Sequence, residues 1–294
     1  MSINAKGAIT GWYEDSKDTF HSFVRAADGT ITTFDVKGDK CDSGGTDALS
    51  INRQGTIIGA YQDGNCIDHG FIRASTGKVT TFDAPKSVAT AGYSINDKGV
   101  ITGSYVDTNN NVHGYMRATD GKFTSFDPNG SIATYPYSIS KSGVIAGSYA
   151  DKGDDYRGFV RAADGTIKTF DVEGSAETDA NCINDLGYTV GEYYTNDTFD
   201  GYLRAPDGTI TTIDPDGTIE TFLSAINDGG IITGAYSTTD GMQHGFVRAA
   251  DGTYTTFDPK KSTDTYPESI NRMGAVAGLY ADSLGQLHGF LRTP

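Results

Sequence analysis

A repeat with a period of 43 to 48 residues fills the chain and limits the folds open to it. The segment that begins SINDKGVITGSYV at Ser94 returns with small changes at six other places. The residues equivalent to Ser94 are Ser2, Ser50, Ser138, Cys182, Ala225 and Ser269. Self-similarity at such a period is typical of repeat architectures, in which each repeat is one supersecondary unit. We therefore expect a single domain, 1–294, built from the repeats 2–49, 50–93, 94–137, 138–181, 182–224, 225–268 and 269–294.

Each repeat reads as four short strands, which we label A to D. In the repeat of Ser94, a β-prone run at 93–96 ends in the turn Asn96-Asp97-Lys98-Gly99, and VITGSYV follows. Asn closes such a turn with its side chain, and Gly takes the left-handed position. A variable polar loop leads to HGYMRA, and the pair Asp120-Gly121 joins this run to KFTSFD. Asp-Gly between two β-prone runs is a strong hairpin signal, so the repeat predicts an antiparallel meander.

Meanders of four strands and this length are typical of propeller blades. A β-solenoid fits less well, because hairpin turns do not serve its parallel coils. We predict an all-β fold, a seven-bladed β-propeller of four-stranded antiparallel blades. Strand D occurs only six times, so the last blade is expected to have three strands and a bare edge at 289–292. Such an edge is either protected or used for pairing.

The charge balance excludes several classes of partner. Lys and Arg number 23 against 38 acidic residues, which gives a net charge of −15. Nucleic-acid binders need a positive footprint, and anionic membrane surfaces also attract basic proteins. No apolar run is long enough to span a bilayer. Because Met1 leads directly into the first repeat, we expect no signal peptide in this chain, which fits either a cytosolic protein or one whose signal peptide has been removed. We expect no nucleic acid and no membrane insertion.

Several residues are constant in all seven repeats and are interpreted as structural. Strand B keeps a Gly and, two residues later, a Tyr, as in Gly103 and Tyr105. A Gly inside a strand indicates close backbone approach, here attributed to the narrow inner part of neighbouring blades. Strand C keeps an Arg, and we expect Arg117 to pair with Asp127 at the end of strand D.

All five histidines fall at the start of strand C, where Arg157 and Asp200 take the other two places. Equivalent positions in a ring of blades lie too far apart to share a metal ion, whose bonds are about 2 Å long. We expect each His to make a hydrogen bond inside its own blade, for example His113 to Asp107.

The three cysteines bear on the compartment. Cys41 lies in the longest D–A connection and Cys66 in the B–C loop of the next blade, so both are expected on one face. The sequence favours a Cys41–Cys66 disulfide and an oxidising compartment, and the alternative is two reduced surface thiols. Cys182 replaces a strand-A Ser and is expected to be a buried thiol.

The turn and strand motifs resemble those of the extracellular repeat family called HAF, after its His-Ala-Phe motif. The resemblance covers the whole chain, with Gly or Ser in place of the middle Ala. The blades that begin at Ser138 and Cys182 lack the His. The family implies a secreted bacterial β-propeller, hence an extracellular or periplasmic location, and no particular reaction. The matching residues are His69-Gly70-Phe71, His113-Gly114-Tyr115, His244-Gly245-Phe246 and His288-Gly289-Phe290, preceded by Ile51-Asn52, Ile95-Asn96, Ile226-Asn227 and Ile270-Asn271.

Variation between repeats is concentrated in the D–A and B–C loops, which share one face of a propeller. A constant Thr precedes each strand A after the first, and the residues that follow it differ in every repeat. Aromatic walls with a few polar groups are the usual make-up of ligand sites. The candidate ligand-binding residues are Trp12, Asp47, Tyr93, Tyr135, Tyr137, Asp179, Asn181, Glu192, Phe222, Tyr266 and Glu268.

Three functions follow as alternatives. The first is a secreted binding protein for a carbohydrate or cell-surface glycan on the variable face. The second is a polysaccharide lyase or glycoside hydrolase at that face, because glycoside hydrolysis needs two carboxylates. The third is an assembly subunit that associates through the open edge of the last blade. The candidate catalytic residues are Asp47, Asp179, Glu268, Tyr137 and Arg157, with Glu192 and His113 as further acid and base candidates.

No cofactor is expected from the sequence, because it contains no Cys/His metal spacing. The Asp- and Asn-rich loops 107–111 and 151–155 raise calcium as an alternative, although their spacing differs from that of an EF-hand.

Overall fold

The computed structural model describes residues 1–17, 19–39, 41, 44–195, 198–215 and 217–294. These residues form β-strands joined by turns and loops, and they include no helix, so the all-β prediction is confirmed. Consequently, no helix in the described ranges is long and apolar enough to cross a membrane. The chain divides into two compact units, Met1–Gly143 and Val144–Pro294, which are described one at a time.

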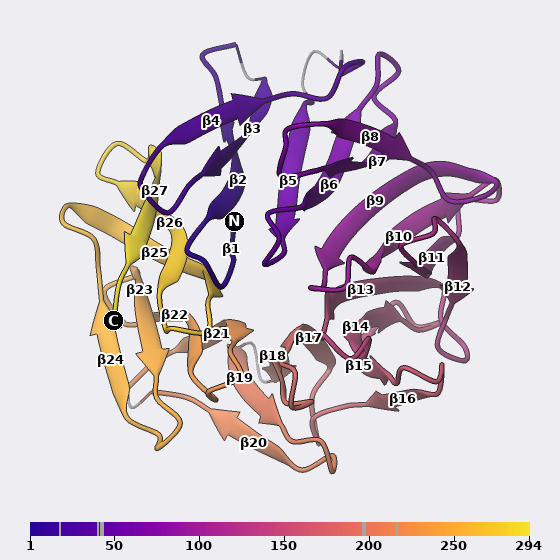
Figure 1. The fold of residues 1–294 in the computed structure, drawn as a ribbon. Helices are drawn as coiled ribbons and strands as arrows, with labels where there is room; N and C mark the ends of the chain where they lie inside the picture. Colours follow the sequence, from indigo (N-terminus) through magenta and orange to yellow (C-terminus); the bar gives the residue numbers. More distant parts are fainter. Residues whose placement is uncertain (18, 40, 42–43, 196–197, 216) are drawn as a thin grey trace. The chain divides into compact units, whose positions relative to one another are not determined.

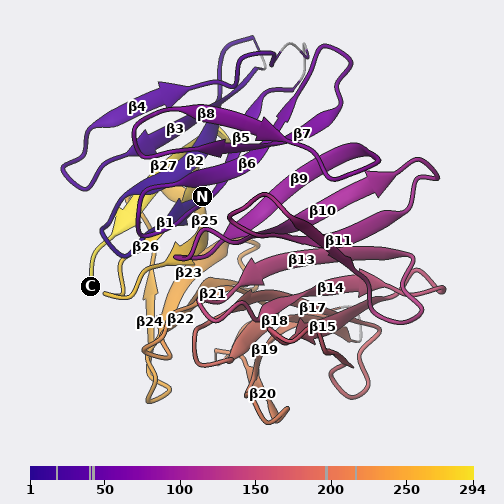
Figure 2. The same ribbon diagram turned by 45° about the vertical axis from the view of Figure 1, so that its right-hand side comes forward.

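Unit 1 contains three antiparallel sheets of four strands, and the strands follow one another in chain order (Figure 1). Figure 2 shows these strands from another side. A further strand, β13 (Ala133–Ile139), packs against β10 and β11. The three sheets are β1 (Ser2–Ile3), β2 (Ile9–Glu14), β3 (Phe20–Arg25) and β4 (Ile31–Phe34); β5 (Thr46–Ile51), β6 (Ile57–Gln62), β7 (Asp68–Arg73) and β8 (Val79–Phe82); and β9 (Ser87–Ile95), β10 (Ile101–Asp107), β11 (Val112–Arg117) and β12 (Phe123–Phe126).

Unit 2 repeats this pattern. It begins with the ladder β14 (Ile145–Ala150), β15 (Tyr156–Arg161) and β16 (Ile167–Phe170). Two four-stranded sheets follow, and the last sheet has three strands in the described residues, as the sequence predicts. These sheets are β17 (Glu177–Ile183), β18 (Thr189–Thr195), β19 (Thr198–Arg204) and β20 (Ile210–Ile213); β21 (Glu220–Ile226), β22 (Ile232–Ser237), β23 (Gln243–Arg248) and β24 (Tyr254–Phe257); and β25 (Ser262–Ile270), β26 (Val276–Asp282) and β27 (Leu287–Arg292).

The Asn-x-x-Gly turns close the A–B hairpins, except where Ser140 replaces the Asn, and they also link neighbouring sheets. The Asn96 side-chain oxygen accepts hydrogen bonds from the backbone N–H groups of Lys98 and Val100, both at 3.0 Å. Gly99 takes the left-handed conformation at φ +81°, which favours glycine. The Asn96 side-chain nitrogen donates to the Ser140 carbonyl at 3.0 Å, 44 residues away. One side chain thus fixes its own turn and the distance to the next repeat.

The constant Arg stacks on the sheet that precedes it in the chain. The guanidinium of Arg117 lies 5.0 Å from the centroid of the Phe82 ring, and that of Arg73 lies 4.7 Å from Phe34. The expected Arg117–Asp127 pair is wrong, for a reason visible in the register. Arg117 is opposite Phe123, at the far end of the β11–β12 ladder from Asp127. The Arg therefore stabilises contacts between sheets through a cation–π interaction.

The disulfide that the sequence favours is present, whereas Cys182 is half-buried and not buried as predicted. Cys41 and Cys66 form a disulfide, with Cα atoms 5.1 Å apart. It ties the connection before β5 to the β6–β7 loop of the same sheet. Cys182 keeps its thiol, which is half-buried and donates to the Ile226 carbonyl at 4.0 Å.

Candidate functional site

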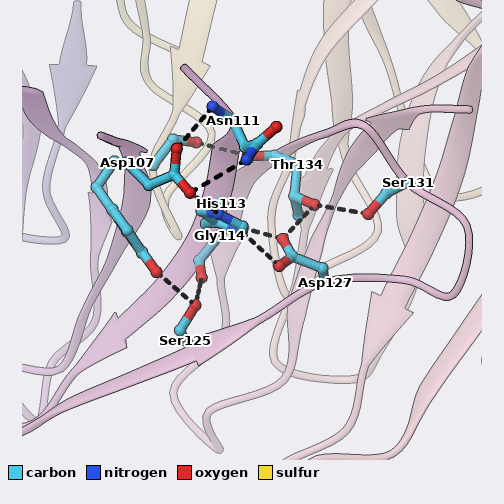
Figure 3. Close-up of polar contacts among 10 residues, drawn as sticks. Asp107, Asn111, His113, Gly114, Ser125, Asp127, Ser131 and Thr134 are labelled. Atoms are coloured by element: carbon cyan, nitrogen blue, oxygen red, sulfur yellow. Dashed lines mark hydrogen bonds and ion pairs between the residues drawn. The ribbon is translucent and has the colours of Figure 1, made fainter. Parts of the chain in front are cut away.

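The repeated histidines belong to a hydrogen-bond network that joins three strands (Figure 3). His113 Nδ1 lies 2.7 Å from Asp127 Oδ2, and its Nε2 lies 3.4 Å from Asp107 Oδ2. The hydroxyl of Thr134 donates to Asp127 Oδ1 at 2.7 Å. The imidazole also packs on the ring of Tyr105, with centroids 5.1 Å apart. The predicted His113–Asp107 bond is confirmed, and Asp127 extends it to β13, the first strand of the next repeat.

The contact between His and the Asp that follows strand D recurs in three further repeats. His21, His69 and His244 contact Asp35, Asp83 and Asp258 at 3.0, 2.9 and 2.8 Å. The carboxylates of these aspartates raise the pKa of His21 and of His244, so the contact favours the charged imidazole. The repeated His and Asp side chains therefore have a structural role, because they join strand C to the residue after strand D in each of these sheets.

Arg157 takes the place of His in one repeat and has the same structural function. It forms ion pairs with Asp151, Asp155 and Asp171 at 3.3, 3.0 and 3.7 Å. Its positive charge is therefore matched within its own sheet. The role of a lyase arginine, raised by the sequence, would require Arg157 to leave these carboxylates.

The variable residues lie inside strand A and not in the loops before it. The sequence places strand A at 93–96, whereas β9 begins at Ser87. The extra residues pair with strand B, with Ala91 opposite Ser104 and Thr90 opposite Tyr105. The expectation that these residues form loops is wrong, because their backbones complete the sheet ladder.

A β-bulge interrupts strand A at the same place in five sheets. In β9 the register shifts between Gly92 and Ser94, so Tyr93 is the extra residue. The constant Gly of strand B makes room for this bulge, since a Cβ built on Gly103 would lie 2.0 Å from the Ala91 backbone oxygen. The predicted close approach at Gly103 is confirmed, but it occurs within one sheet. Bulges re-aim side chains and are frequent beside functional sites. The extra residues are Leu49, Tyr93, Asn181, Ser224 and Glu268.

In unit 1 the inner strands carry a cluster of tyrosines. The rings of Tyr93 and Tyr137 lie 6.1 Å apart, and those of Tyr135 and Tyr137 are stacked at 6.2 Å and 10°. All three side chains are half-buried, whereas the neighbouring Thr134 is buried. The half-buried rings are suited to stack on a flat or ring-shaped ligand.

Asp47 occupies in β5 the position that Tyr135 has in β13, directly after the constant Thr. Burial raises the pKa of its carboxyl to about 6, and the negative charges of Asp68 and Asp39 add to the rise. Its Oδ1 atom is buried and has no hydrogen-bond partner among the described residues. A buried carboxylate oxygen without a partner is costly unless something else satisfies it. Sequence reasoning missed Asp68 and Asp39, because only the fold brings them near Asp47.

Trp12, on β2, is 36% exposed, and its ring meets the edge of Phe20 at 5.0 Å. It therefore offers a partly exposed indole face in unit 1.

In unit 2 two carboxyl groups face each other on β17 and β18. Asp179 and Glu192 are direct cross-strand neighbours in the ladder. Asn181 donates from its side-chain nitrogen to Glu192 Oε2 at 2.5 Å. Desolvation, followed by the charge of Asp179, raises the pKa of Glu192 to about 8. Glu192 is therefore a neutral carboxylic acid at pH 7, beside an Asp179 whose own pKa is raised by burial.

Tyr202 contacts the backbone of Asp179, and the sequence analysis did not identify it as a site residue. Its hydroxyl donates to the Asp179 carbonyl at 2.9 Å, and Tyr115 does the same to Ala91 at 3.1 Å. Both rings are fully buried on strand C, where other repeats have Phe71, Phe159 or Phe246. The presence of Tyr where other repeats have Phe could have identified this residue from the sequence.

The remaining candidates of unit 2, which are Phe222, Tyr266 and Glu268, lie on β21 and β25. Phe222, opposite Ala235, packs on Phe199 at 5.5 Å. Tyr266 is half-buried, and its pKa is raised by burial and by Asp264. Glu268 is the bulge residue of β25. The carboxylate that acts on Glu192 is that of Asp179.

No metal centre is evident in the described residues. They contain no group of three or more His, Cys, Asp or Glu side chains that could hold a metal ion. In the two Asp-rich loops, Asp107 accepts from the backbone N–H groups of Asn109 and Asn111, and Asp151 from that of Gly153. The carboxylates thus close the loops themselves.

Comparison with known proteins identifies the fold. No protein-family model and no curated protein matches the chain. Virginiamycin B lyase from Staphylococcus aureus is similar with a TM-score of 0.65 and 14% identity, covering 99% of this chain and 93% of that chain. The β-propeller domain of the Trilobed protease from Pyrococcus furiosus, which has an open velcro topology, gives 0.68 and 10%, covering 98% and 91%. TolB from Acinetobacter baumannii gives 0.61 and 12%, covering 86% and 63%. At these identities the likeness shows a β-propeller fold and nothing about the ligand.

Proposed function

We propose that the chain is a secreted, seven-bladed β-propeller that binds a carbohydrate at the inner strands of its blades. The repeat count supports seven blades, and the Cys41–Cys66 disulfide supports an extracellular or periplasmic location. The resemblance to HAF repeats supports the same location. Partners of this kind, a glycan or an oligosaccharide, are also consistent with the net charge of −15.

One observation carries the proposal. The constant positions of the repeat have structural roles in turns, stacks and hydrogen bonds, whereas the three strand-A residues after the constant Thr form a different combination in every repeat. These positions hold half-buried tyrosines and carboxyl groups, including the Asp47 oxygen that lacks a partner among the described residues. Sugars present C–H faces for aromatic rings and hydroxyl groups for carboxylates, so this composition matches a carbohydrate.

The proposal is tested by glycan binding. We would screen the intact protein on a glycan array and measure the strongest hit by calorimetry, with Tyr137→Ala as the site variant. Loss of one stacking ring should weaken binding about tenfold, or about 1.4 kcal/mol. The control is Tyr13→Ala, because Tyr13 is a 40% exposed ring that packs on His21 at a repeated scaffold position.

Equal affinities of the two variants, or no binding to any glycan, would count against a carbohydrate site. Thermal unfolding of both variants checks that the fold is kept.

A second candidate is cleavage of a glycan, and the Asp179–Glu192 pair favours it. A carboxylic acid that is neutral at pH 7 can protonate a leaving oxygen, and the nearby carboxylate can act as base or nucleophile. Release of reducing or unsaturated sugar that stops in Glu192→Gln, and that declines in the parent protein as pH rises through about 8, would support this function. Binding without release, in both proteins, would leave the chain a binding module.

A further inference from the structure

Three neighbouring strands of unit 1 carry the tyrosines and the Asp47 carboxyl group of the proposed site. The backbone N–H of Ile95 on β9 donates to Ser50 Oγ on β5 at 3.3 Å. The backbone N–H of Ile139 on β13 donates to Ser94 Oγ on β9 at the same distance. β5, β9 and β13 therefore lie side by side, which can be followed in Figure 1.

The carboxyl group and the rings belong to one site. Asp47 in β5 and Tyr135 in β13 both follow the constant Thr, and each is half-buried between two buried residues of its strand. Alternate side chains of a strand point to opposite faces, so both side chains point away from the packed face. Tyr135 stacks on Tyr137, which lies 6.1 Å from Tyr93. After burial, the charge of Asp68 raises the pKa of both Asp47 and Tyr93, so this carboxylate acts on the acid and on the aromatic wall alike.

The surroundings of the Asp47 carboxyl are acidic. The charged groups that act on it are Asp68 on β7 and Asp39 in the connection before β5. Its Oδ1 atom is buried and has no hydrogen-bond partner among the described residues. None of the three residues that follow the constant Thr is Lys, Arg or His in any repeat. A partly buried negative charge of this kind is stabilised by a cationic group with N–H donors.

We propose that the ligand of this site is an amino sugar whose amine is free and protonated. The ammonium group donates to Asp47 Oδ1, and the sugar ring stacks on the tyrosines of β9 and β13. Tyrosine rings attract cations through their faces and also pack against the C–H face of a sugar. A lysine side chain offers the same ammonium group but no flat ring for the stacked tyrosines, which favours the sugar. This inference rests on the proposed carbohydrate function and narrows it to a cationic sugar.

The test compares tetramers of glucosamine, N-acetylglucosamine and glucose, which differ in the substituent at one ring carbon. Calorimetry with the full chain at pH 7 should show that the glucosamine tetramer binds at least about tenfold more tightly than the other two. Asp47→Asn should weaken glucosamine binding about tenfold and leave the other two affinities unchanged, because only the ammonium group uses this carboxylate. Tyr137→Ala should weaken the binding of all three, since every one of them presents a ring face.

The matched control is Asp120→Asn, which removes the same charge from an exposed turn of unit 1. Asn can still accept the hydrogen bond that Asp120 receives from the Lys122 backbone N–H at 2.9 Å. This variant should keep the preference for glucosamine. Loss of the preference in Asp120→Asn as well would assign it to the net charge of the protein and would overturn the proposal.

The parent protein gives a second measurement that needs no variant. Its affinity for the glucosamine tetramer should fall as pH drops through about 6, because the Asp47 carboxyl becomes protonated, whereas its affinity for the N-acetylglucosamine tetramer should not change there.

The outcomes separate this inference from the function on which it rests. Equal affinities for the three tetramers would overturn the preference for a free amine and would leave the carbohydrate function standing. An oligolysine that binds as tightly as the glucosamine tetramer would overturn the choice of a sugar. No binding of any tetramer or of any glycan on the array would overturn the carbohydrate function and this inference with it.

Discussion

Single residues in this repeat divide into two kinds by whether they recur. His113, Arg117 and Thr134 recur and have matched partners in the scaffold. Glu192 occurs once, at a strand-B position that is Ala or Ser in four other repeats and lies opposite Asp179. A group that is present once cannot be required by the repeat. Its raised pKa is then either a local cost or part of a function.

Glu192→Gln should be more stable than the parent protein at high pH. The pKa of Glu192 is raised to about 8, so its contribution to stability is complete below its unfolded pKa and is lost as pH rises through about 8. The Gln variant stays neutral, and its free energy of unfolding should exceed that of the parent by roughly 5 kcal/mol at pH 9, with a smaller difference at pH 5. Urea unfolding across this pH range measures the difference.

The control for this experiment is Glu173→Gln, because Glu173 is exposed in the connection before β17. If Glu192→Gln and Glu173→Gln show the same pH dependence, Glu192 is charged in the folded protein.

At the level of elements, the bulge in strand A is the feature that separates scaffold from site. It places Tyr93 in β9 and Asn181 in β17 out of the regular ladder. The constant Gly of strand B is the counterpart of this bulge in the sheets that have it, because a Cβ there would meet the backbone of strand A. The strand thus presents one extra side chain per repeat without losing its pairing.

Gly103→Ala should destabilise the protein, because its Cβ would lie 2.0 Å from the backbone oxygen of Ala91. Overpacking against backbone costs about 1–3 kcal/mol. Gly92→Ala is the matched control, with its nearest contact at 3.3 Å from Ile58 Cδ1 and with Ala48 and Ala180 at the equivalent positions. Chemical denaturation of both variants tests the assignment, which fails if they are equally stable.

At the scale of the whole molecule, the chain is an acidic β-propeller held by turns, inter-sheet stacks and one disulfide. The disulfide joins two connections separated by 25 residues in sequence. The step from Ser2 to Ser50, at 48 residues, is the longest between repeats. The disulfide constrains the connection that contains these extra residues. Such a bond persists in an oxidising compartment.

Removing the disulfide by Cys41→Ser with Cys66→Ser should lower the free energy of unfolding by about 3 kcal/mol, from the greater entropy of the unfolded chain. Reductant should destabilise the parent protein to the same level and leave the double variant unaffected. Cys182→Ser is the control, because a Ser hydroxyl at that position can still donate to the Ile226 carbonyl. A reductant effect in the double variant would assign the loss to another cause.

The sequence by itself determined the all-β class, the Asn-x-x-Gly and Asp-Gly turns, the three-stranded last sheet, the disulfide and the His113–Asp107 bond. These features depend on contacts within a turn, a hairpin or a repeat, so the pattern of one repeat encodes them. The tertiary structure alone decided the length of β9, the bulge at Tyr93 and the partner of Asp127. It also set the pKa values of Asp47 and Glu192, because register and burial arise from packing between strands and sheets. Desolvation by such packing leaves no local signature in the sequence.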